Sequence, residues 1–312
     1  MSSSGKIVLA VGVYDNADIL RDFIEWHYHL GIDFAIAYDY GSQDGSRDIL
    51  ADLARRKLVD WITIPDKNYM RFDPFTRIAH RARDEFNADW IIVVDTDEFV
   101  CPPCGGLRAS IDLARSTDIS VITMPGYNMT GPQVIDGASA PATLILRVDH
   151  AVKTTREQEL SGDLPVPYVF VRNQTKTIVQ ASALIGYTPG GHLAQHTTGQ
   201  SADIPGLSFR HYPFRSYESF EMKVRNTAAW LEINPEFKPG MAWHWRRWIR
   251  LYREGRLREE HASQFVSPTR ASELLREGVC TIDETVSSWV ARTAPERGAT
   301  HHEQSKEGAR GG

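Results

Sequence analysis

The sequence predicts an α/β protein with a Rossmann-like, mostly parallel sheet flanked by helices. Short apolar runs rich in β-branched residues alternate with amphipathic segments through the first hundred residues. Hydrophobic residues make up 42% and charged residues 24% of the 312 residues, which is the balance of a globular protein with a large core. The alternation stops near residue 105, so we expect a less regular second half that ends in helices.

The first half contains four runs that are typical of strands: residues 7–11, 34–38, 58–64 and 90–94. The helices between them are expected to begin at Asp15 or Asn16, at Ser46 and at Asp73-Pro74. Gly31 is expected to end the first helix. Repeated strand–helix units of this kind form parallel sheets.

In the second half, further strands are expected at residues 119–124, 143–148, 168–171 and 177–179. Helices are expected at residues 216–231, capped by Ser216, and at 241–258. The second helix carries the run Trp243 to Arg250, which we expect to dock on its own domain. Residues 296–312 are polar and glycine-rich and should form a disordered tail.

The charge and the ends of the chain limit its partners. With a net charge of −5 and no basic stripe, nucleic acid is not expected as a partner. No apolar stretch suggests a signal peptide or an integral membrane segment, so we expect a cytoplasmic protein. The spacing of Cys101 and Cys104 is that of a redox or zinc motif, but no second pair completes a site, and incidental loop cysteines are the better interpretation.

The most informative motif is Asp95-Thr96-Asp97-Glu98-Phe99, which directly follows the strand at 90–94. Ligands bind at the carboxyl ends of strands in open α/β sheets. Two carboxylates in this position can share Mn²⁺ or Mg²⁺, which prefer oxygen ligands and substrate phosphates. The alternative is an ordinary turn after a strand, where aspartate is common.

Asp39 ends the second strand in the same way and begins a segment rich in glycine, serine and aspartate. A carboxylate there can accept a hydrogen bond from a nucleobase, and the following helix amino terminus favours anions. The alternative is a simple turn with a helix cap. The presence of Asp95 and Asp97 on the same sheet favours the ligand-binding interpretation.

These segments resemble the family 2 type of glycosyltransferases with a GT-A fold, in the bacterial branch with an Asp-x-Asp-Glu-Phe signature. The resemblance rests on the following segments: 15–20, 38–46, 89–99, 176–179, 191–192 and 210–218. It implies a nucleoside diphosphate sugar donor, Mn²⁺ or Mg²⁺, and a single domain over residues 1–295. Residues 1–105 would bind the nucleotide sugar, and residues 106–295 would bind an acceptor, which could be a glycan, a lipid-linked glycan or a small molecule.

The resemblance also implies roles for individual residues. Asp39 would contact the donor base, Asp95 would lie near the ribose and metal, and Asp97 would be the main metal ligand. Further donor contacts would come from Val13, Asp15 and Asp44. The first loop departs from the family, because it reads Asp-Asn-Ala-Asp at 15–18 where Asn-Glu-Ala-Asp is common.

The catalytic base is not identified by the resemblance, because no Glu-Asp pair stands at the expected place. Inverting transfer needs a group that removes the acceptor proton. The candidates are His192, Asp136 and Asp163. His192 could instead be a metal ligand or a surface residue.

Three other residues are candidates for the donor's diphosphate or its metal. Lys176 and Arg215 could pair with phosphates, and His211 could bind metal or phosphate. A solvated Lys176 and a packed His211 are the plain alternatives.

The sequence therefore favours a metal-dependent, inverting glycosyltransferase that acts on an acceptor hydroxyl or amine. A nucleotidyltransferase or sugar-nucleotide pyrophosphorylase would be expected to carry a glycine-rich basic loop after the first strand, and residues 11–16 lack one. A non-catalytic nucleotide-sugar-binding protein is the alternative from another class, although it would have little use for two metal-binding carboxylates.

Overall fold

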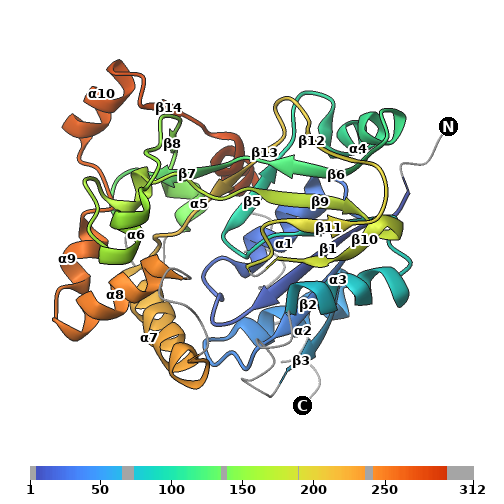
Figure 1. Ribbon diagram of the computed structural model, residues 1–312, viewed down its shortest axis with the longest axis horizontal. Coiled ribbons are helices and arrows are strands. Elements are labelled where there is room, and N and C mark those ends of the chain that lie inside the picture. Colours follow the sequence, from blue (N-terminus) through green and yellow to red (C-terminus); the bar gives the residue numbers. More distant parts are fainter. Residues whose placement is uncertain (1–4, 65–73, 135–138, 189, 236–241, 294–312) are drawn as a thin grey trace, which may run out of the picture.

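A seven-stranded sheet lies at the centre of the computed structural model, which describes residues 5–64, 74–134, 139–188, 190–235 and 242–293 (Figure 1). Its strands are β1 (Ile7–Val13), β2 (Phe34–Asp39), β3 (Val59–Thr63), β4 (Trp90–Val93), β6 (Ile119–Met124), β9 (Lys176–Gln180) and β12 (Gln200–Asp203). They follow the order β12-β6-β9-β4-β1-β2-β3. Strand β1 runs parallel to β2 and β4, whereas β9 runs antiparallel to β4 and β6. The predicted α/β class with a mostly parallel sheet is therefore confirmed.

A second sheet includes β5 (Glu98–Cys101), the strand that follows β4 of the first sheet along the chain. Its other strands are β7 (Gly126–Thr130), β8 (Leu146–Val148), β13 (Ser208–His211) and β14 (Cys280–Ile282), in the order β14-β8-β7-β13-β5. A separate pair is formed by β10 (Leu184–Tyr187) and β11 (Ala194–His196). Because β5 follows β4 after four residues, the Asp95–Asp97 turn lies at the junction of the two sheets.

Helices cover both faces of the first sheet. The helices on the first sheet are α1 (Leu20–His29), α2 (Ser46–Arg55), α3 (Pro74–Asp84) and α4 (Gly106–Ser116). The second half adds α5 (Ala140–Thr143), α6 (Arg156–Ser161), α7 (Tyr217–Ile233), α8 (Trp243–Arg253), α9 (Leu257–Ala262) and α10 (Pro268–Arg276). Alternate residues of β1 pack on α1, α2 and α4 on one face and on α3 on the other. The sheet is thus buried on both sides, and its strand ends remain available for a site.

Several predicted boundaries are confirmed. The four strands of the first half overlap the predicted runs, and α3 begins at Pro74. The hydroxyl of Ser216 caps α7 by accepting from the backbone N–H of Ser219. No helix among the described residues is both long and apolar enough to span a membrane. Asp73 and the tail at 296–312 lie outside the described residues.

The predicted caps of the first two helices are wrong. Helix α1 begins at Leu20 and has no side-chain cap, because Asp15 and Asn16 belong to a loop held by other contacts. Ser46 is the first residue of α2 rather than its cap. Gly45 is the cap residue, and the carboxylate of Asp44 before it accepts from the N–H and the hydroxyl of Ser46.

Three elements of the second half also differ from the prediction. Tyr168–Phe170 is a 3₁₀ helix rather than a strand. Pro167 precedes it, and the side-chain amide of Asn128 donates to the carbonyl of Val169. The predicted strand at 143–148 is reduced to β8 by the short helix α5. The predicted helix at 241–258 is two helices, broken at Gly255 with φ 72°.

The buried residue His27 should make stability depend on pH. Its Nδ1 lies 2.8 Å from the carbonyl of Phe23, and burial lowers its pKa from 6.5 to about 4. The folded state therefore disfavours protonation, so this contribution is complete above pH 6.5 and is lost as the pH falls toward 4. We expect His27 to account for about 2 kcal/mol of stability lost between pH 7 and pH 5.

Urea unfolding at both pH values measures this difference. It should shrink by that amount in His27→Leu and remain unchanged in His29→Leu, because His29 lies exposed on the same helix. Equal pH dependence in wild type and His27→Leu would contradict the assignment.

Candidate functional site

The site is built around the turn that joins β4 to β5. The N–H of Glu98 donates to the carbonyl of Asp95 at 2.9 Å, which closes the turn. Strand β13 pairs with β5 so that His211 lies opposite Glu98, and the N–H of Tyr212 donates to the carbonyl of Asp97 at 2.8 Å. Sheet register therefore brings His211 beside Asp97, although more than a hundred residues separate them.

Asp97 is a buried carboxylate between two cations. Its Oδ2 accepts from Lys223 Nζ at 2.6 Å and from Arg215 Nη1 at 3.3 Å. Burial alone would raise the pKa of Asp97, but Lys223 and Arg215 hold it well below its usual range. Asp97 is therefore ionised, and its other oxygen faces His211.

The hydrogen bonds around His211 determine which of its nitrogens carries the proton. Asn128 donates its amide hydrogens to the carbonyls of Val169 and Val171, so its oxygen must be the atom that faces Nδ1 of His211 at 2.8 Å. Nδ1 is then the protonated nitrogen. Burial lowers the pKa of His211 to about 4, so the ring is neutral at physiological pH.

The unprotonated Nε2 of His211 lies 3.8 Å from Oδ1 of Asp97. A nitrogen lone pair and a carboxylate oxygen repel each other unless a cation or a hydrogen-bond donor lies between them. An imidazole whose other nitrogen donates to an oxygen is the usual arrangement of a metal-binding histidine. The pair therefore fits a divalent cation, although no group of three or more His, Cys, Asp or Glu is gathered for one within the described residues.

Asp95, the third predicted metal ligand, is not brought into this pair. Lys176 is completely buried and contacts Asp95 Oδ2 at 2.8 Å and Glu98 Oε2 at 3.2 Å. Burial raises the pKa of Glu98, although Lys176 opposes this shift. The Asp95 side chain is 48% exposed and so remains accessible from outside.

His192 lies close to this group. The carbonyl of Gly190 accepts from Lys176 Nζ at 3.3 Å, and a Cβ on Gly190 would come within 2.7 Å of the His192 ring. Gly190, with φ +84°, therefore both makes the turn and leaves space for the imidazole. Burial lowers the pKa of His192 to about 4, and its buried Nδ1 has no hydrogen-bond partner.

The predicted donor-binding residues of the first half lie at the carboxyl ends of β1 and β2, and each is held by other protein groups. Asp39 accepts from Ser42 N–H at 3.0 Å and from Arg47 Nε at 2.8 Å. Burial alone would raise the pKa of Asp39, but the bonds from Ser42 and Arg47 bring it below its usual range. Its base-reading role remains a prediction.

The neighbouring loop is held in a similar way. Asp15 accepts from Gln43 N–H at 2.7 Å and from Asn226 Nδ2 at 2.9 Å, whereas Asp44 accepts from Ser46 N–H at 3.0 Å. The carbonyl of Val13 accepts from Tyr40 N–H at 2.9 Å.

The other two candidate bases are not part of the group around Asp97. Asp163 is 82% exposed and pairs with Arg250 at 3.5 Å on the surface. Asp136 lies outside the described residues. The run Trp243 to Arg250 forms most of α8, and Trp248 is buried against Phe214 and Phe220, so this helix packs on its own domain as expected.

The charged side chains around Asp97 and Asp95 balance one another. Asp18 lies 2.5 Å from Arg215 Nε, so three carboxylates (Asp18, Asp95 and Asp97) face three cations (Lys176, Arg215 and Lys223). Glu98, with its raised pKa, tends to hold a proton. The group therefore has no surplus positive charge for a diphosphate.

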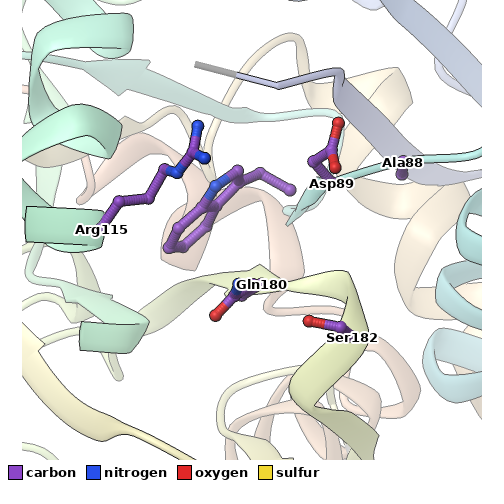
Figure 2. Close-up of a pocket in the computed structure, with 6 residues that line it drawn as sticks. Ala88, Asp89, Arg115, Gln180 and Ser182 are labelled. Atoms are coloured by element: carbon purple, nitrogen blue, oxygen red, sulfur yellow. The ribbon is translucent and has the colours of Figure 1, made fainter. Parts of the chain in front are cut away.

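A small pocket lies at the opposite end of β4 (Figure 2). It is lined by Ala88, Asp89, Trp90, Arg115, Gln180 and Ser182. Trp90 begins β4, whereas Asp95 follows the end of that strand. This pocket is therefore separate from the candidate site.

Comparisons with known proteins give one family. The model of glycosyltransferase family 92 matches residues 8–185, which include Asp39, Asp95, Asp97 and Lys176. No curated protein matches the sequence.

Solved structures with related folds are distant. S. aureus TarS 1-349 shares 12% identity, with a TM-score of 0.36 over 86% of this chain and 83% of that one. Glucosyl-3-phosphoglycerate synthase from Mycobacterium tuberculosis, in complex with Mn²⁺, UDP and glucosyl-3-phosphoglycerate, shares 11% identity, with a TM-score of 0.26 over 40% of this chain and 44% of that one. A 4-diphosphocytidyl-2C-methyl-D-erythritol synthase shares 12% identity, with a TM-score of 0.32 over 57% and 76%. Likenesses of this size define neither substrate nor mechanism.

Proposed function

This chain belongs to glycosyltransferase family 92, and we propose that it transfers a sugar from a nucleoside diphosphate sugar to an acceptor hydroxyl or amine with the help of Mn²⁺ or Mg²⁺. The observation that carries the proposal is the pair formed by Asp97 and His211. Two metal-binding atoms face each other at the carboxyl edge of the sheet, where α/β proteins bind their ligands. The resemblance to the family 2 type of glycosyltransferases, which the sequence indicated, stays a prediction.

The charge balance supports a requirement for the cation. A donor diphosphate brings at least two negative charges to a group whose own charges cancel. Asp97 and His211 would hold the cation, leaving its remaining positions to phosphate oxygens and water. When bound, a divalent cation offsets the charge that develops on the leaving diphosphate.

For the transfer we propose direct displacement with inversion. The acceptor oxygen forms a bond to the anomeric carbon as the bond from that carbon to the diphosphate oxygen breaks. The acceptor proton passes to the imidazole of His192, which burial keeps neutral. Asp95 is held in place by an ion pair with Lys176 and by a hydrogen bond from its own N–H to Glu98.

Thermal unfolding with a panel of nucleoside diphosphates tests the proposed donor class. At least one diphosphate should raise the unfolding temperature with Mn²⁺ present and do so much less in its absence. A panel without any stabilising nucleotide would contradict the proposal.

Replacement of His192 by alanine tests its role as the base. We expect turnover to fall about 100-fold while donor affinity stays within twofold, because the proton transfer occurs only in the reaction. Transfer to water and donor calorimetry are the two measurements, and the exposed His150→Ala is the control. If Mn²⁺-dependent donor affinity falls together with turnover, His192 is a metal ligand. If neither turnover nor donor affinity changes, His192 is neither the base nor a metal ligand.

A further inference from the structure

Two cations bind the same oxygen of Asp97, but the protein holds them differently. The Arg215 side chain is 3% exposed, and it binds Asp18, Asp97 and Ser219 through three different nitrogens. The Lys223 side chain is 20% exposed, and Asp97 is its one hydrogen-bond partner among the described residues. Arg215 is therefore fixed, whereas Lys223 has two donor hydrogens to spare.

The position of Lys223 on α7 places it between the two halves of the site. Ser219, Lys223 and Asn226 follow the helical repeat and share one face. They contact Arg215, Asp97 and Asp15 respectively. The ammonium thus lies between the Asp97–His211 pair and the loop after β1. This loop contains Asp15, a predicted donor-binding residue.

A divalent cation bound to Asp97 and His211 would make the present position of the Lys223 ammonium unfavourable. The cation would neutralise Asp97 and repel the ammonium beside it. Lysine carries its charge on a flexible four-carbon stem and can move, unlike the guanidinium of Arg215. A diphosphate bound to the cation offers the ammonium new anionic oxygens.

We propose that Lys223 is an exchangeable counter-ion. It neutralises Asp97 when no cation is bound, and it turns to the donor's diphosphate once Asp97 ligates the cation. The inference rests on the proposed function and adds to it the residue that couples metal binding to donor binding.

Calorimetry with Mn²⁺ alone and with inorganic pyrophosphate tests this exchange. Lys223→Met keeps the stem and removes the charge, so Mn²⁺ alone should bind about tenfold more tightly. Pyrophosphate at saturating Mn²⁺ should bind about tenfold more weakly, because an ammonium contact is lost. Lys223→Arg retains the charge and should follow wild type in Mn²⁺ binding.

The control is Arg225→Met, because Arg225 lies exposed on the same helix and loses the same charge. Opposite changes in the two affinities support the exchange, since damage to the fold would weaken both. Weakened Mn²⁺ binding, or unchanged pyrophosphate binding, in Lys223→Met would overturn it while leaving the proposed function intact. If wild type binds no Mn²⁺, the proposed metal site fails, and the exchange fails with it.

Discussion

Asp97→Asn should reduce the affinity for a nucleoside diphosphate at least 100-fold in the presence of Mn²⁺. The amide keeps the shape of the carboxylate but removes the anionic ligand from the proposed cation site. It also leaves Lys223 and Arg215 without their common counter-ion. A lost metal ligand costs several kcal/mol, and each 1.4 kcal/mol is a tenfold change in affinity.

Calorimetric titration with and without Mn²⁺ measures this effect. The residual affinity of Asp97→Asn should be the same in both conditions. Asp203→Asn is the matched control, because Asp203 is exposed on β12. If Asp97→Asn binds the nucleotide as wild type does and still requires metal, the cation is held elsewhere.

Arg215→Met should lower the free energy of unfolding by about 3–5 kcal/mol, the usual cost of removing one partner from a buried ion pair. The Arg215 side chain is 3% exposed, so water cannot replace its bonds to Asp97 and Ser219. Asp97 would then keep Lys223 as its single cationic partner among the described residues.

Urea unfolding of Arg215→Met and of Arg250→Met compares the loss of a buried ion pair with the loss of an exposed one. The Arg250 side chain is 47% exposed, and its pair with Asp163 lies on the surface, so its loss should cost less than about 1 kcal/mol. Similar losses in the two variants would contradict a special role for the buried arginine.

The core of the site could be predicted because it depends on strand ends. Asp39 and Asp95 follow apolar runs in the sequence, and they lie at the carboxyl edge of one sheet, as the pattern predicts. His211 was expected to bind metal or phosphate, with a packed histidine as the alternative, and the structure places its Nε2 3.8 Å from Oδ1 of Asp97. Local sequence could give the strands, and the resemblance supplied the link between distant segments.

The partners of these residues could not be predicted from local patterns. Lys223 is an ordinary surface-type residue of an amphipathic helix, and only the packing of α7 over the β4–β5 turn reveals its contact with Asp97. Asn128 fixes the proton of His211 through a strand pairing that had not been predicted. Lys176 was expected at a phosphate, but its buried ammonium contacts Asp95 and Glu98 instead, because a buried cation needs an anionic partner and Asp95 supplies it.

The central claim is that a divalent cation bound with the donor's nucleotide is held between Asp97 and His211. Electron spin echo envelope modulation of Mn²⁺ in the complex of the protein with a nucleoside diphosphate tests it directly. The account predicts modulation from an imidazole nitrogen in wild type and its loss in His211→Ala. A Mn²⁺ signal without a coordinated nitrogen, or one that persists in His211→Ala, would contradict it.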